Sequence, residues 1–138
     1  MNKMKTIYLG KDKNKFEYST IKELREECKK YNIVIGEYVW IGDGVWICEN
    51  VIIKKSVWIE KGVLIENGVV IGKNVWIGKD VLIGEYVWIG EYVWIGDGVW
   101  IRENVVIKKN VVIKKNVVIE KNAIISKNVR IKKKWKIK

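Results

Sequence analysis

From residue 35 onward the sequence reads IGEYVW (35–40), IGDGVW (41–46), ICENVI (47–52) and IKKSVW (53–58), and it continues in hexads to IKKKWK (131–136). The first position is Ile in all 17 hexads, and the fifth is Val in 15. Because one residue separates these positions, both side chains point to the same side of a short strand. The fourth position is Asn, Gly or Asp in 12 hexads, which suits a turn with left-handed backbone. The pattern predicts alternating strands and turns, with no helix after residue 34.

Three sides of six residues make an 18-residue triangular coil. The hexads over residues 35–136 resemble those of the hexapeptide-repeat family of left-handed parallel β-helices, best known from bacterial acyltransferases. The resemblance implies an all-β solenoid, a left-handed parallel β-helix of about six triangular coils. The handedness comes from the resemblance alone, since most parallel crossovers are right-handed.

Residues 1–34 do not follow the repeat. Residues 5–9 and 15–18 have the pattern of two short strands around the turn GKDKN. Thr20 and Glu23 form a capping-box pattern, which opens a helix expected to end near Tyr31 and Asn32. We expect residues 1–34 to form a cap of a small β-hairpin and a helix, because the first coil of residues 35–138 would otherwise expose an open sheet edge.

Side chains at the sixth position of the hexad point outward, and residues 18 apart stack on the same side. One side carries Trp40, Trp58, Trp76, Trp94, Val112 and Arg130. The second carries Trp46, Leu64, Leu82, Trp100, Val118 and Lys136. The third carries Ile52, Val70, Trp88, Val106 and Ile124. Apolar outer faces of this size predict a partner.

Two interpretations of these faces are open. The Trp side chains can pack subunits together in a homo-oligomer, for which the resemblance favours a trimer, or they can form a stacking platform for sugars, bases or another polymer. The candidate interface or binding residues are Trp40, Trp58, Trp76, Trp94, Trp46, Trp100 and Trp88.

Tyr38, Tyr86 and Tyr92 stand at the fourth position, where we expect each ring to lean over the neighbouring turn.

The net charge of +11 arises entirely in residues 102–138, which hold 13 Lys and Arg against Glu103 and Glu120. The basic end comprises Lys108, Lys109, Lys114, Lys115, Lys132, Lys133 and Lys134. Because turns lie at all three corners, we expect these lysines to guard the edge of the last coil rather than to form a groove for duplex nucleic acid. Binding of anions, nucleic acid or an acidic membrane is the alternative.

The chain contains no His. The acyltransferases that the hexads resemble use a His as general base, so no residue here matches that role. We expect Asp43, Asp80 and Asp97 to be solvated turn residues, and Cys28 and Cys48 to be free thiols. The sequence therefore predicts neither a catalytic residue nor a metal ligand.

Together these features favour a non-catalytic scaffold or binding module, which assembles through its Trp-rich faces and binds an anionic or aromatic ligand between subunits, without a cofactor. The alternative is an acyltransferase-like enzyme that uses acyl-CoA and a base other than His. No apolar run approaches the roughly 18 residues of a membrane span, and the start of the chain lacks an apolar core of signal-peptide length. We therefore expect a cytoplasmic location.

Overall fold

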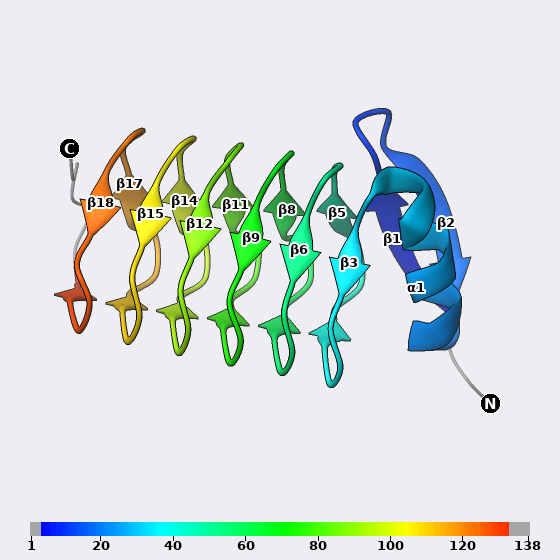
Figure 1. The fold of residues 1–138 in the computed structure, drawn as a ribbon, viewed down its shortest axis with the longest axis horizontal. Helices are drawn as coiled ribbons and strands as arrows, with labels where there is room; N and C mark the ends of the chain where they lie inside the picture. The colour runs from blue at the N-terminus through cyan, green and yellow to red at the C-terminus, as the bar shows by residue number, and fades with distance from the viewer. Residues whose placement is uncertain (1–3, 133–138) are drawn as a thin grey trace.

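The computed structural model describes residues 4–132 and contains one triangular prism with a cap at its N-terminal end (Figure 1). Strands one coil apart pair in parallel, with Ile59 opposite Ile77, so each coil takes 18 residues. The chain winds as a left-handed parallel β-helix. The fold predicted from the hexads is confirmed.

The prism has three flat sides, which we name after their first strands in the repeat. The β3 face consists of β3 (Val34–Ile35), β6 (Ile52–Ile53), β9 (Val70–Ile71), β12 (Trp88–Ile89), β15 (Val106–Ile107) and β18 (Ile124–Ile125). The β4 face consists of β4 (Trp40–Ile41), β7 (Trp58–Ile59), β10 (Trp76–Ile77), β13 (Trp94–Ile95), β16 (Val112–Ile113) and β19 (Arg130–Ile131). The β5 face consists of β5 (Val45–Ile47), β8 (Leu64–Ile65), β11 (Leu82–Ile83), β14 (Trp100–Ile101) and β17 (Val118–Ile119).

The interior of the prism is a dry stack of branched side chains. Every first-position Ile from Ile35 to Ile131 is buried, with an exposed fraction of 6% or less. The fifth-position Val residues are buried as well, except Val39 and Val129 near the two ends, which are partly covered. Because each coil buries its Ile and Val against the coils on either side, the stability of the prism accumulates along its length.

The corners have one backbone conformation throughout. Every fourth-position residue from Tyr38 to Asn128 has a positive φ, between 55° and 76°. Asn and Gly adopt this left-handed conformation at little cost, which explains why they dominate the position. Tyr38, Tyr86 and Tyr92 adopt it too, at φ values of 58–59°.

The cap begins with a hairpin of β1 (Lys5–Leu9) and β2 (Asn14–Tyr18) and continues with the helix α1 (Ile21–Cys28) and the 3-10 turn η1 (Lys29–Tyr31). The predicted capping box of Thr20 and Glu23 is present at the start of α1. The α-helix ends at Cys28, earlier than predicted, because the chain tightens into η1 before it turns at Asn32, which has a φ of 57°. Strand β1 pairs in parallel with β5, so the hairpin extends the β5 face.

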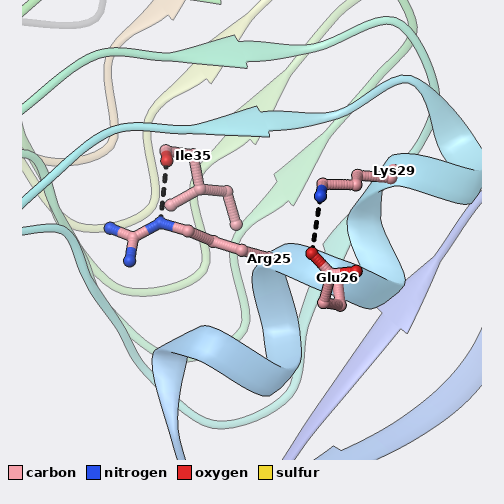
Figure 2. Close-up of polar contacts among 4 residues, drawn as sticks. All are labelled: Arg25, Glu26, Lys29 and Ile35. Carbon is pink, nitrogen blue, oxygen red and sulfur yellow. Dashed lines mark hydrogen bonds and ion pairs between the residues drawn. The ribbon is translucent and has the colours of Figure 1, made fainter.

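The cap provides hydrogen-bond partners for the first coil on all three sides. Arg25 donates from Nε to the carbonyl of Ile35 at 3.0 Å and from Nη2 to that of Gly36 at 2.6 Å. Figure 2 shows the first of these bonds, beside the ion pair between Glu26 on α1 and Lys29 at the start of η1. On the other two sides, Lys5 Nζ donates to the carbonyl of Ile41, and the Gly10 amide donates to that of Ile47. In later coils, the preceding coil supplies these donors.

Candidate functional site

The β4 face carries the longest row of Trp side chains. Trp40 stacks on Trp58 with ring centroids 4.2 Å apart, and Trp76 stacks on Trp94 at 5.0 Å. Nε1 of Trp58 donates a hydrogen bond to Glu60. Within each pair the two rings cover each other's facing surfaces, so a flat ligand would have to separate the rings in order to insert between them.

On the β5 face, one predicted interface residue is engaged within the chain itself. Nε1 of Trp46 donates a hydrogen bond to the carbonyl of Gly10 at 2.9 Å, and Lys13 lies 5.1 Å from the ring centroid. The hairpin therefore covers Trp46 and leaves it half-buried. Trp100, farther along this face, remains 44% exposed, with Arg102 5.4 Å from its ring centroid.

The β3 face contains a groove of about 370 Å³ beside Trp88. Val70, which pairs with Trp88 in the sheet, lines the groove together with Gly72 and Gly90. These glycines let the turns of adjacent coils approach each other closely, since a Cβ at Gly72 would lie 2.8 Å from the backbone of Gly90. Lysines surround the groove: Lys54, Lys108, Lys109 and Lys127, with Glu91 among them. The site can therefore accept a negatively charged group next to an apolar surface.

A second groove lies on the β4 face. It has a volume of about 580 Å³, and Trp76 and Trp94 form its apolar wall. Its polar lining consists of Asp97, Lys114, Lys115, Asn116 and Lys132. Both grooves thus combine Trp with lysines from other coils.

The structure divides the predicted basic end between two corners. Lys108 and Lys109 lie between the β3 and β4 faces, whereas Lys114, Lys115 and Lys132 lie between the β4 and β5 faces. The remaining corner receives a single lysine in this part of the repeat, Lys121. Lys133 and Lys134 lie outside the described residues. The five lysines on the first two corners border the grooves, a role that was not predicted from the sequence: Lys108, Lys109, Lys114, Lys115 and Lys132.

An acidic column runs along the corner between the β5 and β3 faces, and the sequence analysis missed it. It contains Glu49, Glu66, Glu85, Glu103 and Glu120. Burial, followed by the charges of Glu85 and Glu103, raises the pKa of the Glu66 carboxyl above its usual value. Reading the turn positions with an 18-residue period would have revealed this column.

Both cysteines are free, as predicted, and the structure shows that both are buried. Burial is the main cause that raises the pKa of the Cys48 thiol to about 11, and the charges of Glu66, Glu49 and Glu85 add to it. Burial, with a smaller contribution from Glu27, raises the pKa of Cys28 to about 12. Both groups therefore stay protonated near neutral pH and are weak nucleophiles.

Two of the three turn aspartates, Asp43 and Asp97, accept hydrogen bonds from backbone amides. Asp43 Oδ1 accepts a hydrogen bond from the Thr6 amide, and Asp97 Oδ1 accepts one from the Lys79 amide. Within residues 4–132, no group of three or more His, Cys, Asp or Glu side chains could hold a metal ion. No helix in this part of the chain is long and apolar enough to cross a membrane.

The fold defines a hexapeptide-repeat β-helix protein. The chain belongs to the family described as bacterial transferase hexapeptide (six repeats), which matches residues 56–91 and 98–133. No curated protein sequence matches the chain.

Several solved structures share the fold. A mutant of perosamine N-acetyltransferase from Caulobacter crescentus, in complex with CoA and GDP-perosamine, has a TM-score of 0.69 and 18% identity over 72% of this chain and 47% of its own. The UDP-N-acetylglucosamine acyltransferase of Francisella novicida has a TM-score of 0.51 and 22% identity over 72% of this chain and 52% of its own. That of Bacteroides fragilis, also with a TM-score of 0.51, has 19% identity over 72% and 50%. The chain thus spans about half the length of these structures, and the similarity is one of fold.

Proposed function

We propose that the protein is a non-catalytic hexapeptide-repeat scaffold, which assembles with copies of itself through its apolar outer faces and binds an anionic ligand between subunits. The observation that supports self-assembly is the exposure of the outward Trp row, where Trp40, Trp58 and Trp94 are 37–41% exposed. A row of half-exposed Trp side chains reaches the few hundred Å² at which an apolar patch indicates a partner.

The grooves support the ligand part of the proposal. Each places a Trp wall next to several lysines, and an anion with an apolar part would satisfy both. The lack of His in the chain and the protonated state of both thiols favour binding over acyl transfer.

Light scattering on purified protein tests self-assembly. The expected mass is a multiple of the 16.2 kDa chain at micromolar concentration. Trp58→Lys combined with Trp76→Lys should lower that mass, because two charges would have to be buried in the contact. Tyr38→Lys, which changes an exposed aromatic residue at a corner, is the control and should leave the mass unchanged. A 16.2 kDa wild-type particle would refute self-assembly.

The second candidate function is acyl-CoA-dependent acyl transfer with a base other than His. Membership of a transferase family and the fold shared with acyltransferases favour it. Glu91 and Asp97 are the carboxylates that line the two grooves and could accept the proton of an acceptor hydroxyl or amine.

Release of free CoA from acetyl-CoA, measured with amino sugars as acceptors, distinguishes the two functions. We expect no release above background. Turnover that survives purification and disappears in Glu91→Gln or Asp97→Asn, with Glu37→Gln as the control, would establish the second function instead.

A further inference from the structure

Charge is distributed unevenly along the axis of the prism. The coil next to the cap, residues 35–52, holds three carboxylates and no Lys or Arg. Residues 53–106 hold six Lys and Arg against seven Asp and Glu, so the middle of the prism is close to neutral. Residues 107–132, which we name the basic coils, hold eight Lys and Arg against the single carboxylate of Glu120. Figure 1 places these residues at the end of the prism opposite the cap.

The cations of the basic coils are exposed to solvent. Glu120 does not neutralise them, because it pairs with Arg102 of the preceding coil at 3.3 Å. Among residues 4–132, none of the eight cations takes part in an ion pair. Their charge is therefore available to a partner. The eight exposed cations are Lys108, Lys109, Lys114, Lys115, Lys121, Lys127, Arg130 and Lys132.

These cations surround the end of the described prism. Three lie on the corner between the β3 and β4 faces, three on the corner between the β4 and β5 faces, and one on the corner of the acidic column, while Arg130 lies on the β4 face itself. A nucleic-acid duplex favours a stripe of cations along one face. A ring of cations instead matches a flat anionic surface that lies across the axis of the prism.

Distance along the axis decides which charges such a surface would interact with. Neighbouring coils are about 4.8 Å apart, so the basic coils lie within roughly 10 Å of the end of the described prism. Screening at about 0.15 M salt extends over roughly 8 Å. A surface at this end would attract the eight cations, whereas the carboxylates of the first coil, among them Glu37 and Glu49, would be screened from it. Residues 133–138, outside the described part, add four lysines and no carboxylate to the sequence.

An exposed apolar side chain accompanies the charge. Ile124 on β18 is 64% exposed, more than any other outward side chain in the apolar rows of the prism. It lies between the turns that carry Lys121 and Lys127. The interface of an anionic bilayer accommodates both features, because headgroup phosphates neutralise lysines while apolar side chains enter the boundary of the acyl chains. A free phosphate or a phosphate backbone would satisfy the lysines alone.

We propose that the basic coils dock end-on to a bilayer that contains anionic lipids, with Ile124 inserted among the headgroups. The axis of the prism then stands along the bilayer normal, and the cap points away from the membrane. The proposal goes beyond the function proposed above and does not depend on self-assembly, because it uses the end of the prism and not its sides.

Cosedimentation with lipid vesicles tests the proposal. At about 0.15 M salt the protein should bind vesicles of equal parts phosphatidylserine and phosphatidylcholine, and it should not bind vesicles of phosphatidylcholine alone. Lys109→Ser, Lys115→Ser and Lys127→Ser together should lower the partition coefficient about thirtyfold or more, because each Lys near an anionic surface contributes a factor of about five.

The matched control removes three lysines from earlier coils. It combines Lys55→Ser, Lys61→Ser and Lys73→Ser, and each of these residues lies on the same corner and at the same hexad position as its counterpart, three coils nearer the cap. The net charge of the two triple variants is identical. The control should lower the partition coefficient less than about threefold, because the removed charges lie farther than the screening length from the membrane.

A second pair of variants tests the apolar contact. Ile124→Asn should lower the partition coefficient about fivefold or more without a change in charge. Ile52→Asn is its control, since Ile52 is an outward residue of the same face, four coils nearer the cap and 42% exposed. It should leave the partition coefficient unchanged.

The outcomes separate the bilayer from other partners. Losses in the end variants but not in their controls support end-on docking. Equal losses in the two triple variants, no loss in Ile124→Asn, or no binding of the wild-type protein to anionic vesicles overturns it. Glycerophosphoserine, the soluble headgroup, should not compete at the lipid concentration; full competition would assign the binding to a phosphate site in a groove and refute the proposal. Far-UV circular dichroism confirms that each variant folds.

Discussion

Ile77 lies in the middle of the prism and is fully buried among other Ile and Val side chains. Ile77→Asp would place a carboxylate without a partner in this dry stack, so we expect the free energy of unfolding to fall by more than about 4 kcal/mol. Urea unfolding followed by circular dichroism measures the change. Leu82→Asp, at an outward position that is 41% exposed, is the control. Equal losses in both variants would contradict the assignment of inner and outer positions.

Tyr38 has a backbone conformation that disfavours its side chain. Its φ is 59°, and the residue is 81% exposed, so little packing would be lost on substitution. Tyr38→Asn should therefore raise the free energy of unfolding by about 0.5–1 kcal/mol. Glu37→Asn, one residue earlier and outside the left-handed region, should give no such gain. A loss of stability in Tyr38→Asn would mean that the ring makes contacts essential to the corner.

At the scale of elements, the cap acts as a substitute for a missing coil. Arg25 on α1 supplies the donors for the carbonyls of Ile35 and Gly36. Arg25→Met should lower the free energy of unfolding by about 1–3 kcal/mol, because partly buried carbonyls would lose their partners. Lys22→Met removes the same charge from an exposed position on the same helix and serves as the control. The midpoint temperatures of thermal unfolding are compared between the two variants. Identical midpoints would show that Arg25 does not secure the cap.

At the scale of the whole molecule, the distribution of charge bears on nucleic-acid binding. Lys108 and Lys109 occupy the corner between the β3 and β4 faces, and Lys114 and Lys115 occupy the corner between the β4 and β5 faces. The remaining corner, between the β5 and β3 faces, carries the acidic column. We therefore expect no retention of duplex DNA in a filter-binding assay at about 0.15 M salt, where screening extends over roughly 8 Å. Retention at that salt concentration, lost when these four lysines become Ser, would place the protein among nucleic-acid-binding proteins.

Much of the fold could be predicted because each coil repeats one local rule. The inward Ile, the inward Val and the left-handed corner follow from the spacing within a hexad, and the capping box marked the start of α1. The candidate site was harder to predict. Trp46 has the same local sequence as Trp100, yet the hairpin covers only Trp46, because the pairing of β1 with β5 joins residues far apart in the chain.

By itself, the sequence determined the coil, its length and its dry interior, since hydrophobic period and turn chemistry act over a few residues. Only the tertiary structure decided which side chains line a groove. Lys54, Trp88 and Lys127 are far apart in the chain and meet at the groove on the β3 face. The physical reason is that the hexad specifies the backbone and the inward side chains of each coil, whereas a groove depends on how the outward side chains of several coils pack together.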